Sequence, residues 1–254
     1  MSPLTAVMWT LGLSLFERTC IGTTDALRPG GLTDIVNITA CEVLATSIVV
    51  WLILRVHAAH SSVREALSVR AIDITDFFVS VVAGAGLRPL LSTLDDLILR
   101  KWPYDAVELE SMGKLVARSS RTELVLGVFV IMPIARELFF RGILFERLRR
   151  SLSPAITAAW TAALYACSSL DLRAMPSALI LGTALSILRG ATGSVVASIL
   201  AHAAFWAVDG IPILGGRDPS ADVMYPPKWI VAGAAIALVA LLACGRNRRE
   251  IRSQ

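Results

Sequence analysis

Long apolar runs separated by short polar breaks dominate this chain of 254 residues. A helix needs about 20 mainly apolar residues to cross the ~30 Å hydrocarbon layer of a bilayer. The pattern predicts eight spans, at residues 3–20, 34–56, 73–92, 122–148, 154–171, 176–189, 193–209 and 228–244. We therefore expect an all-α fold, a polytopic membrane helix bundle of about eight transmembrane helices.

The longest polar stretch, residues 93–121, carries acids and bases together with apolar residues at helical spacing. Leu109, Met112 and Leu115 would share one face of a helix. This pattern predicts an amphipathic interfacial helix that leads into the fourth span. A solvated connector without a function is the alternative.

No Gly/Ser-rich or Pro-rich linker divides the apolar runs, so we expect a single integral membrane domain over residues 1–254. An even number of spans places both termini on one side of the membrane. The basic tail at 245–252 predicts that this side is the cytoplasm. The first run follows no basic amino end, which argues against a signal peptide. We expect a bacterial-type inner or plasma membrane.

The composition supports a membrane solvent, because 55% of the residues are hydrophobic and only 17% are charged. The net charge of +4 favours contact with anionic lipid head groups, and no motif indicates nucleic-acid binding. The four cysteines are scattered without a CxxC pair, and we interpret them as small hydrophobic residues: Cys20, Cys41, Cys167 and Cys244.

Ionisable residues inside the predicted spans are the candidates for function. Each costs at least ~2.5 kcal/mol by insertion scales unless it has a partner or a wet cavity. They are Glu42, Arg88, Arg136, Glu137, Arg141 and His202. Their partners must come from within the bundle.

Two ion pairs are expected among these residues. Glu137 and Arg141 stand at i and i+4 on one helical face, which predicts a pair within the fourth span. Arg136 needs a counterion, and Glu137 and Glu42 are the candidates. Glu42 could pair with Arg136 or with Arg88, and either pair would join two helices.

Polar residues from three spans fall at a similar depth. At ~1.5 Å per residue, Glu137 lies about 20 Å from the cytoplasmic end, Ser169 about 25 Å and His202 about 17 Å. We therefore expect these three residues to meet near the midplane of the membrane, where polar groups build functional sites.

Three motifs in this order resemble the CPBP (CAAX protease and bacteriocin-processing) family of intramembrane proteases. The segment Glu137-Leu-Phe-Phe-Arg141-Gly142 resembles the second half of its EExxxRG motif. Tyr165 to Ser169 falls where its FxxxH motif belongs, and Thr192-Gly193-Ser194 followed by His202 resembles the stretch that leads into its HxxxN/H motif. The resemblance covers about residues 63–245 and implies a membrane endopeptidase fold.

The resemblance also shows where the chain departs from the family. The family's water-activating glutamate, first histidine and asparagine correspond to Arg136, Ser169 and Trp206. Of the family's polar set, Glu137, Arg141 and His202 remain. We expect the site around Glu137 and His202 to be lined by six further residues: Arg136, Phe140, Arg141, Tyr165, Ser169 and Trp206.

A catalytically impaired protein, or pseudoprotease, is the function that we favour. It would bind a membrane-embedded peptide or protein partner, in regulation or self-protection. The first alternative is an active endopeptidase that uses Glu137 and His202. A Ser169–His202 pair is less favoured, and we interpret Ser169 as a packing residue.

A transporter is the further alternative, but the chain lacks the repeats expected of one. We predict neither a metal nor a cofactor, because HExxH is absent and only three histidines are present.

Overall fold

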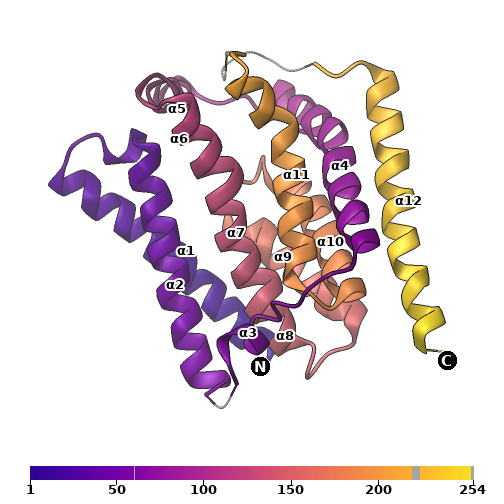
Figure 1. Ribbon diagram of the computed structural model, residues 1–254. Coiled ribbons are helices and arrows are strands. Elements are labelled where there is room, and N and C mark those ends of the chain that lie inside the picture. The colour runs from indigo at the N-terminus through magenta and orange to yellow at the C-terminus, as the bar shows by residue number, and fades with distance from the viewer. Residues whose placement is uncertain (60, 219–223, 253–254) are drawn as a thin grey trace.

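The computed structural model describes residues 1–59, 61–218 and 224–252, and side chains at the C-terminal end as far as residue 244. Helices lie side by side in a bundle, and both chain ends are at the same end of it (Figure 1). The elements are α1 (Pro3–Leu27), η1 (Gly31–Thr33), α2 (Ile35–His57), α3 (Val63–Ala66), α4 (Ile74–Lys101), α5 (Ala106–Arg118), α6 (Arg121–Leu126), η2 (Gly127–Ile131), α7 (Met132–Glu137), η3 (Leu138–Leu144), α8 (Phe145–Leu148), α9 (Pro154–Ser168), α10 (Met175–Thr192), α11 (Val195–Leu214) and α12 (Pro227–Arg252).

The predicted all-α membrane bundle is confirmed, because every predicted span coincides with one helix or one helical rod. In the described ranges, five helices are long and apolar enough to cross a membrane: α2, α4, α10, α11 and the part of α12 up to Cys244. The other three predicted spans are less regular. The helix α1 carries Glu17 and Arg18, α9 has only 15 residues, and the span predicted at residues 122–148 is divided into shorter helical segments. The basic tail lies outside the residues whose side chains are described.

Two of the long helices, α2 and α11, begin at a residue whose side chain accepts hydrogen bonds from free backbone N–H groups. Asp34 accepts from the backbone of Val36 and Asn37 at the start of α2. Ser194 accepts from Val196 at the start of α11, directly after Gly193 ends α10 at a φ of 72°. This left-handed glycine lets two long helices follow each other with a very short turn.

The fourth span is one rod, from Arg121 to Leu148, in which α-helical and π-helical segments alternate. Pro133 follows η2 closely, and it has no N–H with which to continue the α-helical hydrogen bonds. A widened π turn accommodates the missing hydrogen bond. The second π segment, η3, contains Arg141 and Gly142 and therefore shapes the motif directly.

Close helix contacts in the other half of the bundle depend on glycine. A Cβ added at Gly84 of α4 would lie 1.9 Å from the carbonyl oxygen of Ala201 in α11. Gly86 of α4 similarly faces Gly233 of α12. These small residues let backbones approach each other, as is typical of helix packing in membranes.

Two apolar clusters flank the fourth rod. One is built from α1, α2, α9 and the η3–α8 segment, and includes Ile53 and Phe140. The other is built from α4, α10, α11 and α12, and includes Leu91 and Phe205. The rod stands between α2 and α11 (Figure 1), so its polar side chains can reach both halves of the bundle.

The helix predicted in the polar stretch is present as α5, in which no residue is buried. Its position at the membrane interface stays a prediction. It begins with a capping box in which Asp105 and Glu108 satisfy each other's backbone N–H groups. Arg173, in the turn before α10, donates to the Glu108 carboxylate at 2.9 Å and fastens α5 to the bundle.

Candidate functional site

Glu137 is the centre of a buried cluster formed by α7, η3 and α11. Its Oε1 atom lies 3.0 Å from Nη1 of Arg141 and 2.9 Å from Nδ1 of His202. The side chains of Glu137 and Arg141 are 0% exposed and that of His202 is 2% exposed. The predicted Glu137–Arg141 ion pair is therefore confirmed, and His202 lies against the same oxygen.

Aromatic rings close the cluster on one side. The guanidinium carbon of Arg141 lies 4.6 Å from the ring centroid of Tyr165, and its Nη2 donates to the carbonyl of Gly182 at 2.8 Å. Tyr165 meets both Phe140 and His202 edge to face, at centroid distances of 5.4 and 6.0 Å. Cation–π and edge contacts of this kind hold the charged groups in a dry environment.

Arg136, which precedes Glu137 in the sequence, turns away from this cluster toward α2. Its Nε atom lies 2.7 Å from Oε1 of Glu42, whose side chain is 2% exposed. This bears out the Glu42–Arg136 alternative. The pair joins α2 to α7 and neutralises the cation that stands beside Glu137 in the sequence.

The expected alternative pairing of Glu42 with Arg88 is wrong. Arg88 lies on α4, which packs against α11, and its Nε atom is 2.5 Å from Oδ2 of Asp209. The sequence reasoning missed Asp209 because it closes the predicted seventh span. Two features of the sequence could have indicated this ion pair: Asp209 ends one apolar run, and Arg88 lies inside another.

Asp209 forms a second buried ionic cluster. The hydroxyl of Tyr225 donates to its Oδ1 at 3.0 Å, and burial together with this carboxylate raises the pKa of Tyr225 to about 12. Trp206 belongs to this cluster: the guanidinium of Arg88 lies 4.9 Å from its ring, which stacks on Phe129 at 5.2 Å.

Ser169 does not join the Glu137 cluster as expected. Its hydroxyl donates to the carbonyl of Ala166, and its own carbonyl accepts from Arg18. Tyr165, one turn earlier, occupies the position against His202. The depth estimate failed because α9 ends at Ser168, so Ser169 caps the helix near the surface instead of lying inside it.

Arg189, at the end of the span predicted at residues 176–189, is a further buried charge that was not among the predicted site residues. It is 1% exposed and lies in the last turn of α10. Its Nε atom donates to the carbonyl of Arg141 at 2.9 Å, and its Nη2 lies 3.0 Å from Glu146. Arg189 therefore supports the motif segment from the side.

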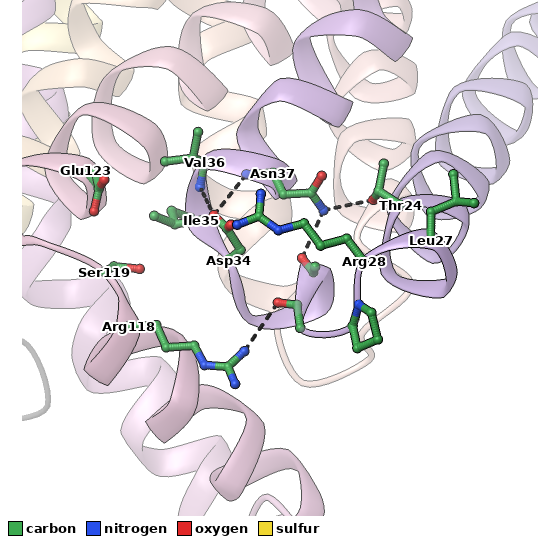
Figure 2. A pocket seen from close by; sticks show the side chains of 13 residues that line it. Thr24, Leu27, Arg28, Asp34, Ile35, Val36, Asn37, Arg118, Ser119 and Glu123 are labelled. Atoms are coloured by element: carbon green, nitrogen blue, oxygen red, sulfur yellow. Dashed lines mark hydrogen bonds between the residues drawn. The ribbon is translucent and has the colours of Figure 1, made fainter.

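The Glu137 cluster is closed to solvent. Oε2 of Glu137 is buried and has no hydrogen-bond partner within the described residues. A cavity of about 730 Å³ lies elsewhere, between the α1–α2 turn and the start of α6. Figure 2 shows Thr24, Asn37 and Arg118 around it.

Two of the four cysteines, which are scattered in the sequence, lie in contact in the structure. The sulfur atoms of Cys20 on α1 and Cys41 on α2 lie 2.9 Å apart. The sequence separates them by a turn, and only the antiparallel packing of α1 and α2 brings them together.

In the described ranges, no group of three His, Cys, Asp or Glu side chains is placed to hold a metal ion.

The fold and the site define an integral membrane protein that encloses an ionic cluster among apolar helices. Residues 119–208 match the family model described as Type II CAAX prenyl endopeptidase Rce1-like. The matched segment extends into α11 and contains Glu137, Arg141 and His202, so the predicted resemblance to CPBP proteases is confirmed. No curated protein and no solved structure matches the chain.

Proposed function

We propose that this CAAX-protease-like membrane protein is catalytically impaired and acts by binding a membrane-embedded peptide or protein partner. Regulation and self-protection are the roles that such a pseudoprotease could serve. The proposal rests chiefly on Arg136, which stands at the position of the family's base and is already paired with Glu42.

Peptide hydrolysis requires a base that can present a free lone pair to water at a suitable pKa. An arginine remains protonated and cannot serve as that base. Glu137 is next in the sequence, but Arg141 and His202 both engage its Oε1 atom. Both surviving groups, Glu137 and His202, are thus in contact with each other, and Arg141 contacts the same carboxylate oxygen.

A groove between α2 and the α6–η2 segment is suited to an apolar partner. It encloses about 670 Å³ and its lining is mostly aliphatic. Val36, Leu44 and Leu126 contribute to this lining and are each at least half exposed. Exposed aliphatic side chains of a membrane helix face lipid, so a hydrophobic chain or helix could enter from the bilayer.

The first test measures cleavage in liposomes. Purified protein is incubated with prenylated CAAX peptides and with leader peptides, and His202→Ala serves as the matched control. We expect no turnover above that of the control. Turnover that His202→Ala abolishes would contradict the pseudoprotease proposal.

Binding is tested with a photo-crosslinking amino acid at Leu44, in the groove, and at Leu238 on α12 as a control of similar exposure. With the same panel of labelled hydrophobic peptides in liposomes, we expect crosslinks at position 44 in at least several-fold excess. Equal labelling at both positions would argue against the groove.

The active endopeptidase remains the second candidate, and one observation favours it. His202 lies 2.9 Å from Glu137, and the Oε2 atom of that carboxylate has no partner among the described groups, so it could accept a hydrogen bond from water. On this alternative, Glu137→Gln removes turnover while thermal stability is unchanged. On our proposal, Glu137→Gln lowers stability because Arg141 loses its counterion.

A further inference from the structure

A third concave site lies beside α8 and the end of α10. The helices α3 and α8 are at the end of the bundle where the chain begins (Figure 1). The site encloses about 390 Å³, within the usual range of roughly 300–1,000 Å³ for small-ligand pockets. It is lined by Arg70, Glu146, Arg149, Arg150, Arg189 and Gly193. The site is separate from the apolar groove between α2 and α6.

The charge of this basic pocket is strongly unbalanced. Four arginines face one glutamate, which leaves a net charge of +3. The glutamate, Glu146, is engaged by Arg189 at 3.0 Å and by the Ser68 hydroxyl at 3.2 Å. Among the described residues, no carboxylate lies within ion-pair distance of Arg70, Arg149 or Arg150. Like charges gathered in a concave site raise the local potential and attract anions.

The pocket is also held rigid by hydrogen bonds. Arg189 is fixed by its contacts with Glu146 and with the carbonyl of Arg141, and its guanidinium lies 5.2 Å from the ring of Phe145. The Ser194 hydroxyl donates to the carbonyl of Arg70 at 2.6 Å, which fixes the backbone that carries Arg70. One of the four guanidinium groups and the backbone of a second arginine are therefore positioned before an anion binds, which lowers the ordering cost of binding.

We propose that the basic pocket binds a phosphate group. Guanidinium groups match the oxygens of phosphate in bidentate geometry, and basic pockets at the ends of membrane helices are suited to anionic head groups. The phosphate can belong to the head group of an anionic phospholipid or be a soluble ion. In both cases the guanidinium groups contact the same phosphate oxygens. Through Arg189 and the carbonyl of Arg141, the bound phosphate stabilises the motif segment.

The test compares the thermal stability of the purified protein in nanodiscs of phosphatidylcholine alone and of phosphatidylcholine with phosphatidylglycerol. A parallel titration adds inorganic phosphate to the neutral discs. A ligand that binds the folded state raises the melting temperature in a concentration-dependent way. We expect such a rise, and we expect added NaCl to weaken it because the contacts are electrostatic.

Arg70→Gln and Arg149→Gln each remove one pocket charge, and both side chains are at least partly exposed, so the fold should survive. Each should weaken binding about fivefold, as expected for one arginine near a membrane surface. Arg55→Gln is the matched control, because Arg55 is an exposed residue in the last turn of α2 and lies outside the pocket lining.

The outcomes separate the two sources of phosphate. A stabilisation by phosphatidylglycerol only, reduced in the pocket variants and kept in Arg55→Gln, identifies a lipid head group. The same pattern with inorganic phosphate identifies a soluble ligand. No stabilisation, or an equal reduction in all three variants, would overturn the proposal. The readout is independent of peptide cleavage and of partner binding.

Discussion

Arg136 and Glu42 form an ion pair beside the buried Glu137 cluster. Each residue is costly inside hydrocarbon when alone, and the 2.7 Å pair removes most of that cost. The pair also joins α2 to the fourth rod across a long sequence distance. A structural role for Arg136 follows from this contact.

Reversing the charges tests this pair at the residue scale. Glu42→Arg and Arg136→Glu should each lower the free energy of unfolding by on the order of 3 kcal/mol, because one buried charge loses its partner. The double variant should recover much of the loss, measured by denaturation in mixed micelles. Simple additivity of the two losses would contradict the pairing.

The exposed pair Glu110–Lys114 on α5 is the control for this experiment. Its nitrogen–oxygen distance is 2.6 Å, but both side chains are more than half exposed. Reversing it should change stability little, because exposed pairs contribute about 0–1 kcal/mol.

At the scale of the elements, α1 and α2 form an antiparallel pair whose spacing can be checked chemically. Cys20 and Cys41 face each other with their sulfur atoms 2.9 Å apart. Thr24 and Asn37 line the cavity shown in Figure 2. Oγ1 of Thr24 and Oδ1 of Asn37 are each 4.0 Å from the sulfur atom of Cys41. A small reagent in that cavity therefore comes close to the thiols.

We expect the two-electron oxidant diamide, which takes up the two electrons and two protons of the thiols, to convert this pair to an intramolecular disulfide. The covalent S–S distance is about 2.05 Å, so a movement of under ~1 Å suffices. Mass spectrometry after alkylation should find Cys20 and Cys41 unlabelled, while the exposed Cys167 keeps its label. Cys41→Ser should restore labelling of Cys20. Persistent alkylation of both thiols would contradict the observed packing of α1 on α2.

At the scale of the whole molecule, one end of the bundle is held together through α5. Arg173 contacts the Glu108 carboxylate and Asp171, and its guanidinium lies 4.3 Å from the ring of Tyr104. These contacts hold α5, and the segment that leads into it from α4, against the turn before α10. The hydrogen bonds from Arg173, and then that from the Asp105 backbone, lower the pKa of Glu108 to about 2.

This pKa shift predicts how stability changes with pH. A carboxyl whose pKa is lowered in the folded state stabilises the protein above its unfolded pKa of about 4.3. That contribution is lost as the pH falls toward the folded value of about 2. Thermal unfolding between pH 6 and pH 3 should therefore show a smaller decline for Glu108→Gln than for the parent protein. Identical declines would contradict the contribution of the Glu108–Arg173 contact.

Much of the fold was predictable from local sequence. Apolar runs predicted all eight helical rods, because hydropathy depends on residues close in sequence. The Glu137–Arg141 pair was predictable for the same reason, since the i, i+4 spacing is a property of a single helix. The motif order also indicated the family that the match at residues 119–208 supports. The assignment of one domain over residues 1–254, and the cytoplasmic side of the termini, stay predictions.

The contacts between helices were decided by the tertiary structure. Glu42 had two possible arginine partners, and the position of α2 beside α7 selected Arg136. The packing of α4 on α11 gave Arg88 to Asp209, and the early end of α9 removed Ser169 from the cluster. The sequence pattern indicates which helices have a lipid-facing surface and which carry a buried charge that requires a partner. Which neighbour meets that need depends on how the helices are arranged and rotated about their axes, and only the assembled bundle fixes both.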